Sequence, residues 1–409
     1  MNSKKIFQIL LISIISLSLS SCVKSKGIIQ KTDFKNEYKF SSEIEDKVAK
    51  DTVPWKYQIS ASDYAAKGDY ENALKHWDLA MKPREKTFSQ TQVDSINKKY
   101  TTVNARDYII KSAKENQIII INEAHHNSQH RMFTKSLLQK LFDIGYKNLG
   151  LEALTNNNGS NLVLNKRKYP IYKTGYYTKD PQFGNLIREA LDIGYNVFPY
   201  EQTTNKNGKL REIEQAKNIQ KIIAQKPNEK FLIHCGYDHA LEGIHKSWEK
   251  AMAGRLNEYT GINPLTINQV FYSEKSDSKN NHPFLKALNI KETSIVIDDN
   301  NTPVKYKRGN AWSDIAIFHP NTKYINGRPN WLFSNENKNV SIKLEGIIID
   351  YPVMVLAFKK GEDINSAIPI DITEVNAQNK QCNLGLKQGE YTIVVTNKKE
   401  SIKFEKNVK

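Results

Sequence analysis

Strand-like and helix-like runs alternate five times from about residue 101, and this alternation limits the possible folds more than any other feature of the chain. Residues 118–121 are four consecutive isoleucines, as expected of a strand buried on both faces of a parallel sheet. Apolar residues then recur at helical spacing: Met132, Phe133, Leu137, Leu138, Leu141 and Phe142. The pattern predicts an α/β domain over residues 101–334, with a mostly parallel sheet and helices on both faces.

The regions before and after this domain have different patterns. Residues 51–100 are predicted to be helical, with residues placed much as in one tetratricopeptide repeat: Tyr64, Gly68, Tyr70, Ala73, Trp77, Ala80 and Pro83. Because a repeat array needs neighbours to bury its faces, this single unit indicates an isolated helical hairpin rather than a peptide-binding array. Residues 335–409 are predicted to form a small accessory β-sandwich, with strands at 340–344, 354–358, 368–372 and 391–395.

The first 21 residues have the three-part plan of a secretory signal. Two lysines precede an apolar run over residues 6–19, which is shorter than the roughly 20 residues needed to cross a bilayer. The Leu-Ser-Ser sequence immediately before Cys22 resembles the lipobox of bacterial lipoproteins. This resemblance implies that Cys22 carries lipid and anchors the chain to a membrane of the bacterial cell envelope, outside the cytoplasm. Cleavage near Ser21 that leaves a free thiol is the alternative.

The polar residues 22–50 show no sustained period, so we expect them to be a linker. The net charge of +16 raises the question of a nucleic-acid partner. The lysines are dispersed among Asn, Glu and Asp, without a basic helix stripe or an aromatic RNA-binding signature, so no nucleic-acid partner is expected. Besides Cys22 the chain has only Cys235 and Cys382, in different predicted domains, and nothing requires a disulfide.

Ionisable residues follow directly on the predicted buried strands: Glu123, Glu152, Glu201 and His234. Because helical crossovers make successive strands point the same way, these residues should lie along one edge of the sheet, where parallel sheets hold their sites. Each of them alone could be a helix cap or the partner of a lysine. As a set they predict a functional site.

The sharpest local feature is the Glu-Ala-His-His sequence of residues 123–126, with His130 one helical turn further on. One carboxylate and two imidazoles in a strand-to-helix turn suit a divalent metal or an activated water. The order differs from the helical zinc-protease motif. One of the two histidines could instead cap the next helix, and the sequence does not decide whether His125 or His126 is the functional one.

Residues 101–335 resemble the superfamily that contains erythromycin esterase-like proteins, ChaN-type haem-binding lipoproteins and the Tiki/TraB group. Residues 123–126 match its Gly-Glu-x-x-His or Gly-Glu-x-His motif, Glu152 matches the Glu that closes the next strand, and residues 236–239 match a Gly-x-x-His motif. Asn122 stands in the usual glycine position. His234 and His239 are further apart than the esterase family's late histidine pair, which favours His239 as the matching residue.

The resemblance implies an extracytoplasmic hydrolase that acts on an ester or amide carbonyl of a small-molecule or peptide substrate. We expect Glu123 and His126 to bind or deprotonate a water, and Glu152 and His239 to complete the site. A divalent manganese, zinc or cobalt ion is optional in this superfamily, with these candidate ligands: Glu123, His125, His126, Glu201 and His239. Cys235 as a nucleophile is a weaker interpretation, because strand alternation turns it away from His234.

The ChaN-type relatives imply a second class of function, the binding of haem or iron without catalysis. Tyr237 and Tyr200 would then be the candidate ligands. A third interpretation is an inactive scaffold whose helical hairpin is an interaction surface. His319 is expected to be structural, and the oligomeric state is left open by the sequence.

Overall fold

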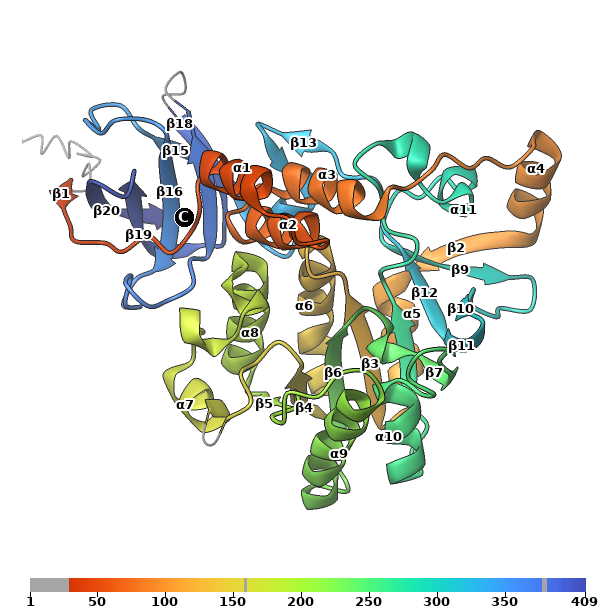
Figure 1. Cartoon of the computed structure of the whole chain (residues 1–409). Helices are drawn as coiled ribbons and strands as arrows, with labels where there is room; N and C mark the ends of the chain where they lie inside the picture. The colour runs from red at the N-terminus through yellow and green to blue at the C-terminus, as the bar shows by residue number, and fades with distance from the viewer. Residues whose placement is uncertain (1–28, 158–159, 377–380) are drawn as a thin grey trace, which may run out of the picture.

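The computed structural model describes residues 29–157, 160–376 and 381–409 (Figure 1). The expected signal segment and the expected lipidation site at Cys22 lie outside these residues. Within them, no helix has both the length and the apolar character needed to cross a membrane.

The largest sheet has eight strands in the order β2-β9-β12-β8-β3-β6-β4-β5 (Figure 1). Six neighbouring strands run parallel: β12 (Ile315–Phe318), β8 (Leu265–Asn268), β3 (Ile118–Glu123), β6 (Lys230–Gly236), β4 (Tyr146–Leu151) and β5 (Asn196–Pro199). β9 (Ser294–Asp298) is antiparallel to β12 and to β2 (Tyr100–Asn104). The prediction of an α/β fold with a mostly parallel sheet is therefore confirmed.

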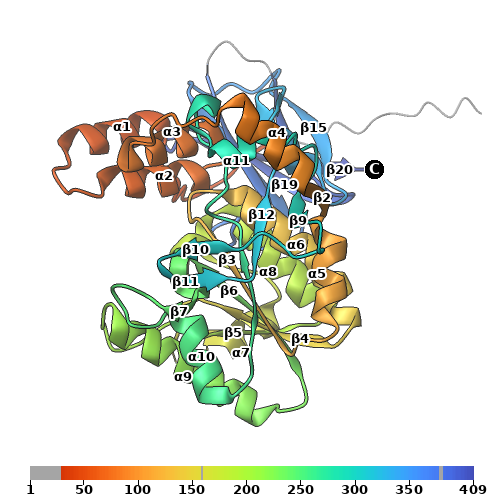
Figure 2. The same cartoon turned by 90° about the vertical axis from the view of Figure 1, so that its right-hand side faces the viewer.

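The four isoleucines of β3 show why this strand is central. Their side chains alternate between the two faces of the sheet, because successive residues of a strand point to opposite sides. Ile119 and Ile121 pack with α5 (Ala105–Ala113), α6 (Ser128–Asp143) and α8 (Pro181–Ile193). Ile118 and Ile120 pack with α9 (Lys209–Gln225) and α10 (Met252–Thr260) on the opposite face (Figure 2). Helices thus cover both faces.

The amino-terminal region is helical, with α1 (Ser41–Lys50), α2 (Lys56–Ala66), α3 (Tyr70–Met81) and α4 (Gln90–Lys99). The linker expected over residues 22–50 is wrong in its described part, because residues 29–50 contain α1 and the short strand β1 (Gln30–Lys31). Phe34, Tyr38 and Phe40 are buried against the carboxyl-terminal sheet. These aromatic residues follow neither a helical nor a strand period, which is why the sequence did not reveal them.

The carboxyl-terminal region contains an antiparallel sheet in the order β1-β20-β19-β16-β17 and a separate pair, β15-β18. Side chains from both sheets share one apolar core. The strands are β15 (Lys338–Lys343), β16 (Val353–Lys359), β17 (Asp371–Val375), β18 (Gln381–Leu386), β19 (Gly389–Thr396) and β20 (Ser401–Val408). β18 and β20 were not predicted, because their few apolar residues are mixed with charged and polar ones.

Smaller elements fill the connections of the α/β part. A three-stranded sheet joins β10 (Tyr306–Arg308), β11 (Asn310–Ser313) and β7 (Glu242–Ile244). The others are α7 (Ser160–Arg167), α11 (Pro283–Ala287), β13 (Tyr324–Ile325) and β14 (Arg328–Pro329). Helices α1 to α3 lie beyond the carboxyl ends of the parallel strands (Figure 1), so they cover the edge at which the predicted site residues gather.

Candidate functional site

Glu123, the last residue of β3, is the centre of the first cluster of charged side chains at the sheet edge. Its carboxylate accepts hydrogen bonds from Arg131 Nε at 2.6 Å, from Arg131 Nη2 at 2.7 Å and from His125 Nδ1 at 3.0 Å. Burial by itself would raise the pKa of Glu123, but the Arg131 guanidinium outweighs it and holds this pKa well below its usual range. Glu123 is therefore ionised.

Arg131 is itself fully buried on α6 and has a second carboxylate partner. Its Nη1 lies 3.0 Å from Asp180 Oδ2, and its Nη2 donates to the backbone oxygen of His125 at 2.9 Å. Asp180 also caps α8 by accepting from Gln182 N and Phe183 N. Arg131 thus fixes the positions of the β3–α6 turn and of the start of α8 together.

His125 has the geometry expected of a general base. A carboxylate can only accept, so the Nδ1 atom that contacts Glu123 carries the hydrogen, and in the neutral ring the lone pair is then on Nε2. The ring stacks on Tyr177 with centroids 3.7 Å apart. A methyl group built on Gly236 would lie 2.7 Å from His125 Nε2 and 3.4 Å from Glu152 Oε2. The imidazole and the second carboxylate therefore both lie close to Gly236.

Glu152 follows β4 and belongs to the second cluster. One oxygen accepts from the backbone N–H of Gly236, and the other contacts Arg211 Nη2 and, at 3.3 Å, His239 Nε2. Burial would raise the pKa of Glu152, but the charges of His239 and Arg211 bring it below its ordinary value. Arg211, at the start of α9, also binds Glu201 through Nε at 3.0 Å, so it joins the two predicted glutamates.

His239 lies within this second cluster, between Glu152, Glu212 and Arg211. Its Nδ1 is 2.8 Å from Glu212 Oε2, and its Nε2 is 3.0 Å from Arg211 Nη1. Burial would lower the pKa of His239, but Glu152 and Glu212 together raise it above the ordinary value. Both ring nitrogens are engaged, which assigns His239 to holding Glu152 in place.

His126 points away from Glu123. Its ring stacks on Trp77 of α3, with centroids 4.2 Å apart and planes 12° apart, and its Nδ1 is buried without a hydrogen-bond partner among the described residues. Burial lowers the pKa of His126 well below the ordinary value. Of the two adjacent histidines it is His125, and not the expected His126, that contacts the Glu123 carboxylate.

His234 on β6 also faces Glu123, with Nε2 3.6 Å from Oε2. Burial lowers its pKa to about 4, so His234 is neutral near pH 7. Cys235, the next residue, turns to the opposite face and packs in the core with Ile233 and Phe231, as the alternation of the strand requires. Burial raises the pKa of Cys235 well above its usual value, which argues against a nucleophilic role.

The arrangement does not fit the divalent metal that the resemblance allows. Among residues 29–157, 160–376 and 381–409, no group of three His, Cys, Asp or Glu side chains is placed to hold one. The expected ligands Glu123 and Glu201 are each bound by a guanidinium, and His126 faces Trp77. A metal would have to displace both arginines from these carboxylates.

The two tyrosines expected as haem ligands have different surroundings. The hydroxyl of Tyr200 is fully buried and donates to the backbone oxygen of His234 at 2.8 Å, so it is already used inside the protein. Tyr237 has a left-handed backbone (φ 43°) and packs edge-on against His125. Burial raises the pKa of both hydroxyls well above the usual value.

A cavity of about 210 Å³ opens onto His125 and Arg131. It is lined by residues from the segment before α1, from α1 and α2, and from the short turn at Tyr177–Lys179. Lys39 in its wall is paired with Asp63, whereas Lys47 and Lys179 have no carboxylate within ion-pair distance in the described part of the chain. The cavity therefore presents positive charge next to the imidazole.

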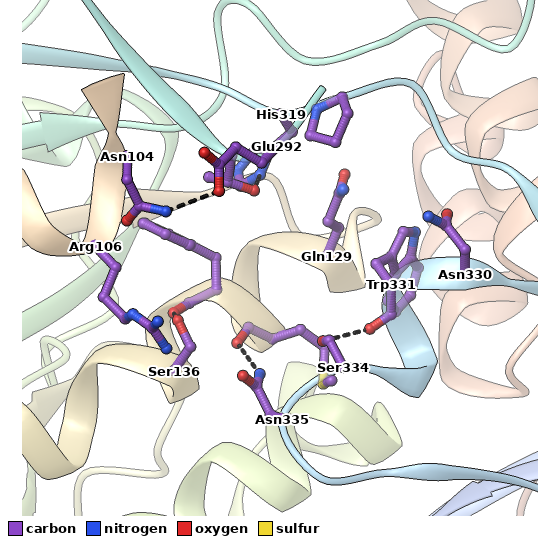
Figure 3. A pocket seen from close by; sticks show the side chains of 14 residues that line it. Asn104, Arg106, Gln129, Ser136, Glu292, His319, Asn330, Trp331, Ser334 and Asn335 are labelled. Carbon is purple, nitrogen blue, oxygen red and sulfur yellow. Dashed lines mark hydrogen bonds between the residues drawn. The ribbon is translucent and has the colours of Figure 1, made fainter. Parts of the chain in front are cut away.

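A second cavity, of about 300 Å³, lies at the same sheet edge beside His319 (Figure 3). His319 contacts Thr293 Oγ1 through Nδ1 and Gln269 Oε1 through Nε2, so neither nitrogen is free. His130 accepts from Ala124 N at Nδ1, hence its Nε2 carries hydrogen and donates to Ser273 rather than activating it. These contacts agree with the structural role expected for His319.

Sequence reasoning missed the two arginines and Tyr177. Arg131 and Arg211 lie on helices, where a cation is normally taken for part of a solvated face. The residues at helical spacing from Arg131 are polar, namely Asn127, Ser128, Thr134 and Lys135, so the pattern did not indicate that this arginine is buried. Tyr177 lies in a connection without any period, and nothing in the sequence pointed to it.

No protein family and no curated protein sequence matches this chain. The solved structures with weak likeness to this chain include the following two. The type III effector HopBA1 shares 11% identity at a TM-score of 0.30, over 44% of this chain and 93% of that one. RRSP, a MARTX toxin effector domain from Vibrio vulnificus CMCP6, shares 14% identity at a TM-score of 0.29, over 53% of this chain and 44% of that one. Scores this low support no argument about fold or activity, so the resemblance to the erythromycin esterase-like and ChaN/Tiki superfamily stays a prediction.

Proposed function

We propose that this protein hydrolyses an ester or amide carbonyl with a water molecule activated by His125. The observation that carries the proposal is the position of His125, whose Nδ1 is held by ionised Glu123 and whose ring borders the cavity. Nε2 can accept a proton from water, and the carboxylate stabilises the imidazolium that forms. Glu123 and Arg131 then act as positioning residues.

Glu152 supports the same chemistry from the other side of Gly236. An ionised carboxylate beside Nε2 can accept the second hydrogen of the attacking water and so aim its lone pair at the carbonyl. Lys179 and Lys47 in the cavity wall favour the negative charge that develops on the carbonyl oxygen. The volume of about 210 Å³ suits a small acyl group, from a small molecule or from the end of a peptide.

The flanking regions have accessory roles in this proposal. Helices α2 and α3 would form the TPR-like hairpin that covers the site, since α2 lines the cavity and Trp77 of α3 packs on His126. The carboxyl-terminal sheets would form a β-sandwich that supports α8. Lipid at Cys22 would hold the site at a membrane outside the cytoplasm, on extracytoplasmic substrates. Intact mass of protein extracted from membranes, compared with Cys22→Ala, tests the anchor.

The hydrolase proposal is tested with p-nitrophenyl butyrate and with a fluorogenic peptide amide. His125→Gln should lower kcat by about 10²–10⁴, the contribution of a positioned general base. His126→Gln is the matched control, because it changes the neighbouring histidine, which faces Trp77, and should keep its kcat. A wild-type rate equal to that of buffer for both probes, or equal rates for wild type and His125→Gln, would refute the proposal.

A further inference from the structure

A third cavity, of about 370 Å³, lies where α6 and α8 meet the carboxyl-terminal sheet, away from the His125 site. The contact between the two regions is tightly built. Gly184 of α8 packs so closely that an added methyl group would lie 2.9 Å from Ile368. Arg188 Nε and Nη2 bind the Glu362 carboxylate at 2.8 and 2.6 Å, and Asn185 Nδ2 donates to Ile370 O. The walls of this cavity are therefore well defined.

The lining of this cavity contains five cationic side chains and three carboxylates. Each carboxylate is matched by one lysine: Lys387 with Glu189 at 2.8 Å, Lys359 with Asp192 at 3.4 Å and Lys360 with Glu390 at 3.3 Å. Two carboxylates outside the lining also form ion pairs with it: Glu362 with Arg188, and Glu336 with Lys387 at 3.3 Å. Among the described residues, Lys135 is the cation of this lining that has no ion pair.

Lys135 is only 5% exposed and makes no hydrogen bond or ion pair with any residue that the structure describes. It lies one helical turn after Arg131 on α6, and that arginine has two carboxylate partners. Burial, with a smaller effect of Lys387, lowers the pKa of Lys135 to about 8. The ammonium form therefore still predominates at pH 7, and an unpaired buried ammonium is costly unless something neutralises it.

We propose that this cavity binds a small organic carboxylate, whose charge pairs with the Lys135 ammonium. A carboxylate can accept a charge-assisted hydrogen bond from this unpaired ammonium. Ile370 and the ring of Tyr391 provide apolar surface for the rest of the ligand. The ligand would contact α6, α8 and the carboxyl-terminal sheet together, and thereby stabilise their contact.

The test is isothermal titration of the purified full chain with sodium butyrate at pH 7, with sodium chloride of equal ionic strength as the blank. We expect saturable binding to wild type, weakened about tenfold or more by Lys135→Met, since a charge-assisted hydrogen bond is lost. Lys360→Met is the matched control, because Lys360 lines the same cavity but is paired with Glu390, and it should bind within about twofold of wild type.

Three outcomes would overturn the proposal: no saturable heat with butyrate, equal affinity of wild type and Lys135→Met, or binding of inorganic phosphate alone. Methionine matches the length of the lysine stem and removes the buried charge, so the variant should fold, which a thermal melt checks. His125→Gln should bind butyrate as wild type does. A failure of the hydrolase proposal would therefore leave this measurement unaffected.

Discussion

Replacing Arg131 by methionine tests whether one buried guanidinium organises the site. The substitution leaves two buried carboxylates without their cation. Asp180 would keep its bonds from Ser128, Gln182 and Phe183, whereas Glu123 would keep only its histidine contacts. The loss should therefore come mainly from Glu123 and amount to about 4 kcal/mol, within the range for breaking a buried ion pair.

Thermal unfolding followed by circular dichroism should show this loss as a fall in Tm of about 10 °C for a domain of this size. The double variant Glu123→Gln/Arg131→Met removes both charges and should regain most of the loss. Arg131→Met should also lower kcat for butyrate ester hydrolysis about 100-fold, because Glu123 and the His125 backbone lose the guanidinium that fixes their positions. Arg188→Met is the matched control: it breaks a similar buried pair with Glu362, lowering Tm but leaving kcat unchanged.

The same pair has a pH dependence with a definite sign. The pKa of Glu123 is lower in the folded chain than its ordinary value of 4.5, so its contribution to stability is present above about pH 4.5 and is lost as the pH falls below it. Arg131→Met should abolish that part of the acid dependence. The reasoning fails if Arg131→Met lowers Tm by less than about 2 °C, or if the double variant is no more stable than the single one.

Two further predictions concern other parts of the α/β region. Gly236→Ala places a methyl group 2.5 Å from His125 Cε1, at backbone angles that alanine tolerates. The kcat should therefore fall about 100-fold while the protein stays folded. Gly254→Ala is the control: its added methyl group has its nearest contact at 3.6 Å, so kcat should not change. Burial, and then Asp314, raise the pKa of Glu242 to about 7. Between pH 5 and 8 the folded state holds a proton on this carboxyl that the unfolded chain releases. The Tm of wild type should therefore fall relative to the Tm of Glu242→Gln as the pH rises from 5 to 8. The same pH dependence of Tm in both proteins would contradict this.

The sheet and the gathering of acidic residues at its edge were predictable, because they follow from burial and from chain direction. Four consecutive isoleucines in a strand require burial on both faces of the sheet. The helical crossovers then make β3 and β4 parallel, which places Glu123 and Glu152 at the same edge. The choice between His125 and His126 was not predictable. It depends on Trp77, about 50 residues earlier in the chain, because Trp77 stacks on the ring of His126 and leaves His125 beside Glu123.

The buried ion pairs could not be predicted from the sequence either. An arginine on a helix has the same local pattern whether it faces water or a carboxylate from another strand. Arg211 meets Glu152 and Glu201 only because β4 and β5 end beside the start of α9. Strand β1 is a similar case, since two residues of no distinctive type pair with β20 at the other end of the chain.

The pairing of β1 with β20 also limits how far the folded protein can lie from Cys22, the expected lipidation site. From Cys22 to Gln30 there are eight residue steps, which at about 3.5 Å each reach at most about 28 Å. With lipid on Cys22, Gln30 in the edge strand β1 would stay within that distance of Cys22, and any pull on the anchor would act first on the β1–β20 hydrogen bonds. The edge of the eight-stranded sheet that holds the proposed site would then also stay near the membrane.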